Sequence, residues 1–271
     1  MSRPLFILVG ILVLLAAAWL GWPAIGPVIS GASCEAAQGF GRLLGNEAIT
    51  NYGCRMMGGL GVTLQLVAIS VGIGVVLGFL VSLVRLYGGP VSSRIALVYT
   101  TFFRGTPLLC QLFLVYYGAG QFRPQLEAVG LWTWFREAFF CAAFTFTLNT
   151  AAYQAEIFRG AIASVGRGQW EAARALGMRW SQILRTIVVP QAAIVALRPL
   201  GNELVIMVKS SAVASLVTIF DLMGTTRLAF ARSFDLSVYL FAAALYLVIV
   251  ELIRRLWDWT EGRLTRHIHH A

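Results

Sequence analysis

The sequence predicts an all-α membrane protein, a bundle of about six transmembrane helices, and three observations support this fold class. Of the 271 residues, 58% are hydrophobic and only 12% are charged, whereas a soluble domain has about 25% charged residues. The apolar residues form runs of roughly 20 residues or more, the length that an α-helix needs to cross a bilayer. Basic residues outnumber acidic ones by 21 to 12, which in a membrane protein indicates arginine-rich cytoplasmic loops. An ordinary soluble enzyme and a disordered chain are therefore excluded.

Six apolar segments are long enough to cross the hydrocarbon layer as helices, which satisfy their own backbone hydrogen bonds. Gly74 and Gly78, in the second segment, have the spacing of a close helix contact. Pro107, in the third, is expected to be tolerated inside its helix. The first segment could be a signal peptide, but its apolar core is too long for one, so we expect a retained span. The six segments are residues 5–28, 59–86, 95–118, 138–158, 192–220 and 238–253.

The arginines set the expected orientation. With the N-terminus inside, the outward loops 29–58, 119–137 and 221–237 each have a net charge of zero and together hold six arginines, whereas the inward segments hold twelve. This two-to-one bias places both termini in the cytoplasm. The chain then divides into an extra N-terminal span with its periplasmic loop, a core of spans, and a cytoplasmic tail. Their expected bounds are 1–58, 59–257 and 258–271.

Cys34 and Cys54 share the first outward loop. An oxidising compartment favours a disulfide between two such residues, and the residues alone leave the pair and two free thiols equally open. The sequence has no group of residues with metal-site spacing. The histidines His267, His269 and His270 gather at the C-terminal end, where we interpret them as part of a solvated tail.

The loop between the fourth and fifth spans, about residues 160–191, carries two helical patterns. Residues 169–176 are good helix formers, and Gly177 follows where a helix C-cap would lie. In residues 180–188 apolar side chains recur with the spacing of one helix face, and we expect Pro190 to end this second helix. The loop is therefore predicted to be a cytoplasmic helix–turn–helix at the membrane surface.

Small residues give the first of these two helices a low-relief surface. Ala172, Ala173 and Gly177 leave room for a partner to approach, and Glu171 and Arg174 flank them with charge. An amphipathic hairpin that only packs beneath the bundle would have the same pattern. The residue types leave these two interpretations equally open.

The same loop resembles a known motif. Residues 171–177 (EAARALG), followed by 187–190 (IVVP), resemble the EAA loop of the permease subunits of ATP-binding cassette importers. The segments 101–109, 148–160 and 199–203 resemble the branch of that family that carries polar amino acids. The tail around 264–267 is similar to that of histidine, arginine and opine permeases. Two departures are the extra N-terminal span and Lys209-Ser210-Ser211-Ala212, where the branch usually has Lys-Asp-Thr-Ser.

The resemblance implies a transporter subunit in the bacterial inner membrane, not an enzyme. It would translocate polar, most simply basic, amino acids or opines. Its partners would be a cytoplasmic ATPase dimer, a second permease subunit (a paralogue or a copy), a periplasmic amino-acid-binding protein and membrane lipid, without nucleic acid. The ATPase would dock on Glu171, Ala172, Ala173, Arg174 and Gly177. This chain has no phosphate-binding GxxxxGK[ST] motif, so we expect no cofactor in it, and ATP and Mg²⁺ would be bound by the ATPase.

Polar residues inside the spans are candidates for the translocation path. A charge at the bilayer centre costs about 2.5–3.5 kcal/mol on insertion scales, so such residues usually face a path or a partner. An amino acid presents both an ammonium and a carboxylate, so its path needs groups of both signs. The alternative is a structural salt bridge, for instance between Lys209 and Glu156 or Glu203. The candidates are Arg104, Asn149, Tyr153, Glu156, Asn202, Glu203 and Lys209.

Two other functional classes fit the sequence less well. An ion-coupled secondary amino acid transporter would also need charges in its spans, but it is expected to have paired, inverted repeats with interrupted helices, and the sequence has no such pairing. An intramembrane enzyme would need a nucleophile with a base, or metal ligands, within the spans. No histidine lies in any predicted span, so the importer remains the leading hypothesis.

Overall fold

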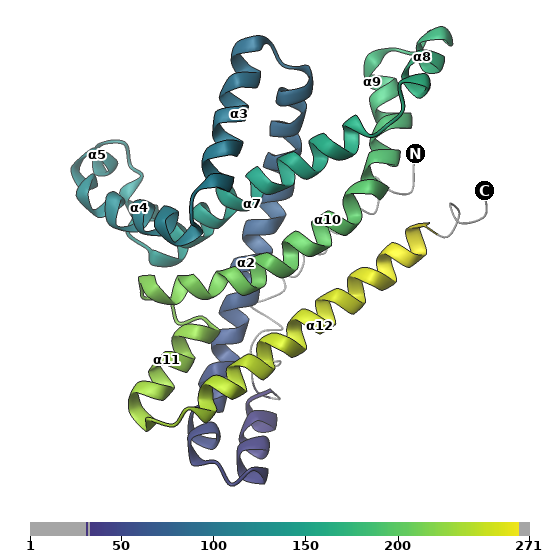
Figure 1. Cartoon of the computed structure of the whole chain (residues 1–271). Coiled ribbons are helices and arrows are strands. Elements are labelled where there is room, and N and C mark those ends of the chain that lie inside the picture. Colours follow the sequence, from purple (N-terminus) through teal and green to yellow (C-terminus); the bar gives the residue numbers. More distant parts are fainter. Residues whose placement is uncertain (1–30, 32, 266–271) are drawn as a thin grey trace.

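The computed structural model describes residue 31 and residues 33–265, and this part of the chain is built of helices without strands (Figure 1). A helical segment at residues 33–43 comes first. The later elements are α2 (Glu47–Tyr87), α3 (Pro90–Gly105), α4 (Leu108–Gln121), α5 (Arg123–Ala128), α6 (Trp132–Phe135), α7 (Ala138–Ala163), α8 (Arg167–Ala175), α9 (Trp180–Ile183), the π-helical turn η1 (Leu184–Val188), α10 (Val189–Ser210), the 3-10 turn η2 (Ser211–Val217), α11 (Leu222–Ser233) and α12 (Ser237–Thr265).

Within these residues, three continuous helices are long and apolar enough to cross a membrane. They cover Glu47–Tyr87, Trp180–Val217 and Ser237–Arg263. The first and third contain the predicted second and sixth spans, and the second covers the predicted fifth span except for its last three residues. The predicted first span, residues 5–28, lies outside the described residues. The last helix continues to Thr265, so the predicted tail begins as helix. The all-helical membrane fold is confirmed, whereas the predicted number and continuity of the spans are not.

The predicted third span, 95–118, is wrong as a single helix. The chain breaks after Gly105, and α3 and α4 point in clearly different directions (Figure 1). Thr106 is extended (φ −115°, ψ 147°), because the ring of a following proline disfavours the helical conformation. Pro107 also has no N–H to continue the hydrogen-bond ladder.

Pro190 does not end the second helix of the cytoplasmic loop, contrary to expectation. The helix that begins at Trp180 continues through α10. The π-helical turn Leu184–Val188 comes directly before the first turn of α10, which contains Pro190. A proline fits the first turn of a helix because its missing N–H is not needed there. The wider π-helical turn thus joins α9 and α10 into one continuous helix.

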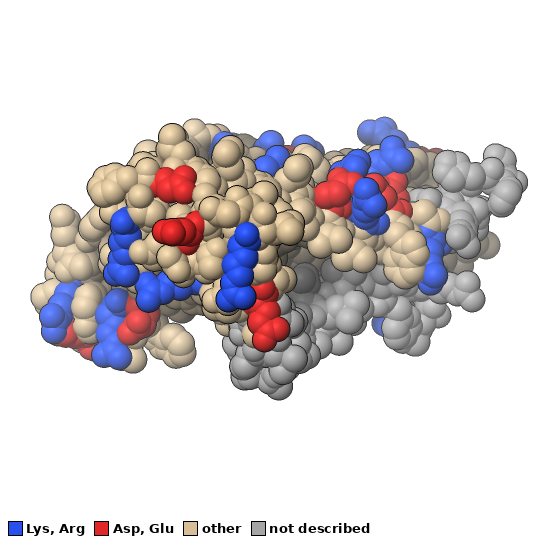
Figure 2. All heavy atoms as spheres, turned by 90° about the horizontal axis from the view of Figure 1, so that it is seen from below, with Lys and Arg blue, Asp and Glu red and all other residues tan. Residues whose placement is uncertain are grey.

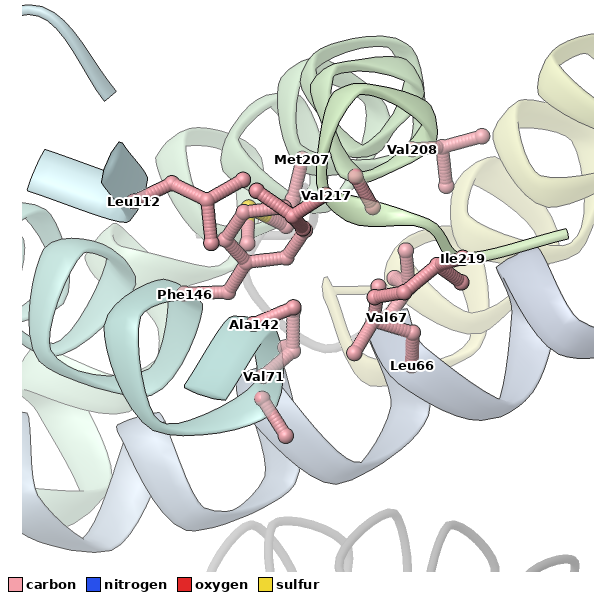
Figure 3. Packing of buried hydrophobic residues seen from close by; sticks show 12 residues of the cluster. Leu66, Val67, Val71, Leu112, Ala142, Phe146, Met207, Val208, Val217 and Ile219 are labelled. Carbon is pink, nitrogen blue, oxygen red and sulfur yellow. The ribbon is translucent and has the colours of Figure 1, made fainter. Parts of the chain in front are cut away.

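Helix α7 lies at the centre of the fold and contacts α2, α3, α4 and α10. Its polar side chains Thr145, Asn149 and Gln154 are buried by these neighbours, so they are shielded from lipid. The main apolar cluster includes Phe146 of α7, and Figure 3 shows Leu112, Met207 and Val217 next to the Phe146 ring, with Leu66 and Val67 of α2 in the same cluster. The structure therefore buries α7 in protein on most sides.

Glycines bring α2 close to α7. A Cβ atom at Gly78 would lie 2.9 Å from both the Ala151 carbonyl oxygen and Gln154 Cβ, and one at Gly74 would lie 2.6 Å from Thr150 Cγ2. No side chain fits at such distances without backbone movement. The predicted role of Gly74 and Gly78 in helix packing is confirmed.

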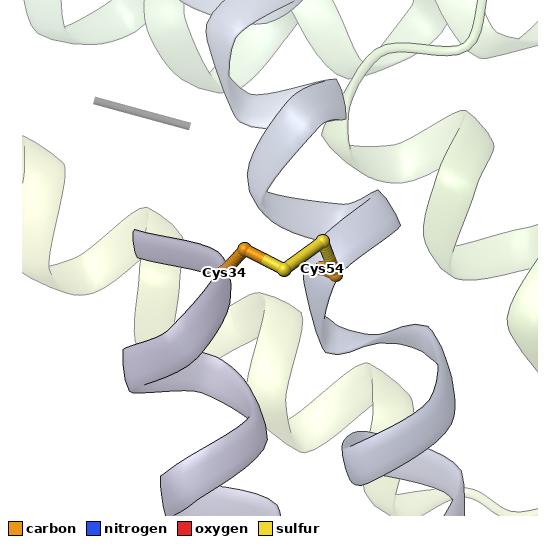
Figure 4. Close-up of a disulfide and its surroundings, with 2 residues drawn as sticks. All are labelled: Cys34 and Cys54. Carbon is orange, nitrogen blue, oxygen red and sulfur yellow. A yellow bond between two sulfur atoms is a disulfide. The ribbon is translucent and has the colours of Figure 1, made fainter. Parts of the chain in front are cut away.

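A helical hairpin forms the opposite end of the molecule from α8, at the bottom of Figure 1. Its two arms, residues 33–43 and the start of α2, are joined by a disulfide between Cys34 and Cys54 (Figure 4). Asn46 Nδ2 donates to Asp235 Oδ2 and to Ser237 Oγ, both at 2.9 Å. These bonds attach the hairpin to the α11–α12 corner. Acidic and basic side chains are interspersed over this end rather than gathered by sign (Figure 2), in agreement with the zero net charge of the predicted outward loops.

Asp221, at the start of α11, is fully buried. Its Oδ1 accepts a hydrogen bond from the Gly224 N–H at 2.8 Å and caps the helix, whereas its Oδ2 has no hydrogen-bond partner. Burial raises the pKa of Asp221 from 3.8 to about 6, against the opposing effect of the Gly224 hydrogen bond. The folded protein therefore favours a protonated Asp221 carboxyl more than the unfolded chain does.

We predict that Gly78→Ala destabilises the protein by about 1–3 kcal/mol, because the added methyl group must displace the α7 backbone. Gly58→Ala is the matched control, since a Cβ atom there meets nothing within 4 Å, and the gain in helix propensity should stabilise α2 by about 0.5–1 kcal/mol. Thermal unfolding in detergent measures both. Equal shifts for the two variants would contradict the close α2–α7 contact.

We predict that stability decreases as the pH rises from about 4 to 6. In this window the unfolded Asp221 is ionised while the folded one holds its proton, and the loss reaches about 2–3 kcal/mol above pH 6. Asp221→Asn keeps the capping oxygen, so it should flatten this part of the unfolding profile and stabilise the protein at pH 7–8. The exposed Asp258→Asn of α12 is the control and should leave the profile unchanged. A wild-type profile that is flat between pH 4 and 6 would refute this account.

Candidate functional site

The first candidate site is the helix α8 with its C-terminal turn. Gly177 has a φ of +72°, a left-handed conformation that glycine adopts without strain. The Gly177 N–H donates to the Arg174 carbonyl at 2.9 Å, and the Met178 N–H donates to the Ala173 carbonyl at 3.1 Å. This pair of bonds is the Schellman motif, which ends a helix and satisfies its last carbonyls. The predicted C-cap is confirmed.

The five predicted docking residues do not all lie on one surface. Glu171, Ala172, Arg174 and Gly177 are exposed, whereas Ala173 is only 1% exposed and belongs to the apolar cluster that joins α7, α8 and α10. Ala173 thus holds α8 against the rest of the protein and is not part of the open surface that was predicted to include it. The exposed residues of α8 include small side chains, one acidic residue, Glu171, and two basic ones, Arg167 and Arg174.

Aromatic side chains attach this hairpin to the end of α2. The Tyr87 ring lies edge-on to Trp180, with 5.0 Å between the ring centroids, and 6.3 Å from Trp170. Ile183, Leu184 and Val188 are buried in the same cluster as Ala173. Edge-to-face aromatic pairs of this kind add about 0.5–1.5 kcal/mol beyond area burial. The α8–α9 hairpin is therefore held by α2, α7 and α10 together.

The second candidate site is a group of charges where α2, α3 and α7 meet. Glu156 forms ion pairs with Arg85, with Arg159 (Nε–Oε2, 2.9 Å) and with Arg104 (Nη1–Oε2, 3.9 Å). Arg85 Nη1 also donates to Thr100 Oγ1 at 3.2 Å. The Arg104 guanidinium lies over the Tyr153 ring, 5.5 Å from its centroid. The structure thus brings the predicted residues Arg104, Tyr153 and Glu156 together.

A network of amide side chains braces the break between α3 and α4. Gln111 Nε2 donates to Thr106 Oγ1 at 2.7 Å and to the Phe103 carbonyl at 2.9 Å. Asn149 Nδ2 donates to Gln111 Oε1 at 3.0 Å and to the same Phe103 carbonyl at 3.1 Å. The predicted path residue Asn149 is therefore engaged in holding the break.

The α10 candidates divide into buried and exposed residues. Glu203 is buried, and its Oε1 accepts a hydrogen bond from Thr150 Oγ1 at 3.1 Å. Asn202 and Lys209 are exposed on α10. Lys209 forms no ion pair with any described residue, so the salt bridge to Glu156 or Glu203 that was left open as an alternative is not present in the described structure. Glu156 forms its ion pairs with arginines instead, because α2 and α3 approach α7 on that side.

Sequence reasoning misses two residues of this site. Arg85 looks like a cytoplasmic loop charge, and Gln111 lies in a segment predicted to be one continuous span. A signal for Arg85 is its place inside the predicted second span, 59–86. For Gln111 the signal is Pro107, four residues before it, since a break there leaves backbone carbonyls that need donors.

Within the described residues, no group of three or more His, Cys, Asp and Glu side chains could hold a metal ion. The side chains that the structure brings together here offer charges and hydrogen-bonding groups. The exposed guanidinium and ammonium groups can bind anions, and the buried carboxylate of Glu203 can bind a cation.

Comparison with known proteins places these features in a family. Residues 71–266 match the family described as the binding-protein-dependent transport system inner membrane component. The nopaline transport system permease protein NocM of Agrobacterium fabrum is 42% identical over 79% of this chain and 89% of its own length. The octopine transport system permease protein OccM of Rhizobium radiobacter is 39% identical over 77% of this chain and 85% of its own length.

A solved structure is also similar. It is described as an amino acid ABC transporter with histidines, and the matched chain is 33% identical to this one, with a TM-score of 0.70 over 79% of this chain and 96% of its own. The matches thus cover most of the relatives' length as well as most of this chain.

Proposed function

The chain belongs to the family of inner-membrane components of binding-protein-dependent transport systems, and from this we propose how it works in an importer. It is the permease subunit of an ATP-binding cassette importer, and ATP is hydrolysed on a partner subunit. We propose that its cargo is a basic amino acid or an opine, in keeping with the cargo named for its relatives. Substrate translocation, not catalysis, is its role.

The observation that carries this proposal is the helix α8, which is packed against the protein through Ala173 and exposes its other side. Its exposed residues Glu171, Ala172, Arg174 and Gly177 form the surface on which the ATPase docks, while Ala173 positions the helix. Because α8 packs on the same cluster as α7 and α10, a displacement of α8 is transmitted to these helices as a rigid-body movement. ATP and Mg²⁺ belong to the ATPase, since this sequence has no phosphate-binding loop.

The translocation path follows the polar residues of α3, α7 and α10. Glu203 supplies a carboxylate that no described cation neutralises within 4.0 Å, and Arg104, Lys209 and Asn202 supply exposed polar groups. Tyr153 and Glu156 hold Arg104 in place, and Asn149 holds the α3–α4 break. Both signs of charge are present, as a path for an amino acid requires.

The remaining partners are inferred from the family to which the chain belongs. A second permease subunit, a paralogue or a copy, pairs with this one around the path. A periplasmic amino-acid-binding protein delivers the cargo at the end that carries the disulfide-linked hairpin. The exposed apolar side chains of α12, such as Leu240, Leu247 and Leu256, face membrane lipid. We assign both chain termini to the cytoplasm, on the arginine distribution.

An ion-coupled secondary transporter is the alternative from another functional class. In that mechanism the exposed α8 surface would have no role. The family to which the chain belongs is also defined by dependence on a binding protein, which a secondary transporter does not need. The intramembrane charges alone fit both classes, so an uptake experiment must separate them.

We predict that membrane vesicles containing this permease take up labelled L-arginine or L-histidine only when the cognate ATPase, the binding protein and ATP are present. The physical reason is that α8 needs an ATPase to move it. Vesicles without the ATPase but with a proton or sodium gradient are the control. Uptake driven by the gradient alone would assign the chain to the secondary transporters.

We predict that Gly177→Asp and Glu171→Lys each reduce ATP-dependent uptake at least about 10-fold while membrane insertion remains normal, because they alter the docking surface and no span. Gly130→Asp is the matched control, since Gly130 has the same φ of +72° and a Cβ atom added at either glycine would meet nothing within 4 Å, but Gly130 lies far from α8 in the chain. It should retain uptake. Wild-type uptake by both α8 variants would remove the docking assignment.

A further inference from the structure

Two buried oxygen atoms without a hydrogen-bond partner lie at one junction of helices. The first is Oδ2 of Asp221, whose side chain is fully buried, and the second is the hydroxyl oxygen of Tyr246 on α12. The two groups are close enough for the charge of Asp221 to act on Tyr246. They lie where α11 packs against α2 and α12 (Figure 1), away from the residues assigned to the translocation path. Since a buried polar atom without a partner is costly, two of them at one junction indicate a binding site.

The other oxygen atoms of this junction have only lone pairs to offer. A Cβ atom at Gly59 of α2 would lie 2.5 Å from Thr225 Oγ1 and 2.6 Å from the Asp221 carbonyl oxygen, so α2 and α11 touch here. The Thr225 hydroxyl donates to that carbonyl at 2.9 Å. The Thr63 hydroxyl, next to Tyr246, donates to the Gly59 carbonyl at 3.2 Å. Because both hydroxyl protons are engaged, these groups can act only as acceptors.

The junction also holds a negative charge that no described cation contacts. Asp221 forms no ion pair with a described residue within 4.0 Å. Among these residues, Arg227 of α11 is the charged group that acts on Asp221, but it is exposed, and its Nη1 donates to the Ser215 carbonyl at 3.4 Å. The packed helices α2 and α12 present the neutral groups Thr63 and Tyr246. The N-terminus of α11 offsets only about half a charge.

A single monovalent cation matches this chemistry. Carboxylate, hydroxyl and carbonyl oxygens are the ligands of hard cations, and one positive charge balances one carboxylate. A divalent ion would leave a surplus positive charge beside Arg227, and Mg²⁺ usually keeps several waters, which the close contact of α2 with α11 at Gly59 does not favour. A bridging water would give hydrogen bonds but would leave the charge of Asp221 uncompensated.

We propose that Asp221 Oδ2 and the Tyr246 hydroxyl bind a sodium ion that joins α11 to α12. The ion is a structural component of the fold and not the driving ion of transport, so this inference does not rest on the proposed function. It implies that the ionised form of Asp221 is stable only with its cation. The loss of stability predicted above pH 6 is then partly recovered when sodium is present.

The test is thermal unfolding of the full-length protein in detergent at about pH 8, in about 0.2 M NaCl or 0.2 M choline chloride. Both salts have the same ionic strength, but choline is too large for the site. The unfolding temperature should be at least about 2 °C higher in NaCl. Burial raises the pKa of Asp221 to about 6, against the opposing effect of the Gly224 hydrogen bond, so at about pH 4.5 the carboxyl is protonated and the sodium effect should disappear.

Two variants test the two ligands. Asp221→Asn keeps the capping oxygen but removes the charge, and should abolish the sodium effect at about pH 8. Tyr246→Phe removes one hydroxyl, and should need several-fold more sodium for half of the effect. Tyr239→Phe is the matched control, because Tyr239 is also a half-buried tyrosine of α12 and packs on Phe230. It should respond to sodium as the wild type does.

Equal unfolding temperatures of the wild type in the two salts at about pH 8 overturn the inference, and so does a sodium effect that persists in Asp221→Asn. If Asp221→Asn does not fold, an unchanged sodium dependence in Tyr246→Phe overturns it. The proposed function is tested separately. Uptake driven by a sodium gradient without the ATPase would remove the proposed function but not this site, and ATP-dependent uptake in both salts would leave the function standing whatever the unfolding experiment shows.

Discussion

The close approach of α7 to α2 is the contact on which the rest of the structure depends. It is possible only because Gly74 and Gly78 have no side chains, and it buries several polar side chains of α7 against protein. Buried in this way, α7 can carry Asn149, Thr150 and Glu156 at membrane depth and direct each of them to a different neighbour. Such polar groups would be costly on a lipid-facing helix.

The same helix connects the charged cluster to the docking surface. Glu156 and Arg159 lie in the last turns of α7, and the chain then passes through the short link at 164–166 into α8. Phe158 and Ile162 of α7 share one apolar cluster with Ala173, so α8 is packed directly against the end of α7. Glu156 in turn contacts α2 and α3. Side-chain contacts therefore run continuously from α8 through α7 to Arg104, next to the break between α3 and α4.

Much of this architecture could be predicted from local signals. The helix 169–176 and its glycine end follow from propensity and from the left-handed turn that Gly177 permits. Long apolar runs indicate the helices α2, α10 and α12. Predictions fail where tertiary packing decides. Pro107 ends a helix and Pro190 does not, because a preceding wide turn accommodates the second. Arg85, and not Lys209, pairs with Glu156, because partner choice depends on how helices approach, and spacing within one helix carries no information about this.

The π-helical turn at Leu184–Val188 has a geometric effect beyond tolerating a proline. It inserts roughly one extra residue into the turn, and one residue corresponds to about 100° of rotation around a helix axis. Everything beyond it on α10, including Asn202 and Lys209, is thereby rotated relative to the α8–α9 hairpin. This turn sets the direction in which Asn202 and Lys209 face. A single-residue deletion within it would rotate these two side chains to a different side of α10 while leaving the sequence of the predicted span 192–220 unchanged.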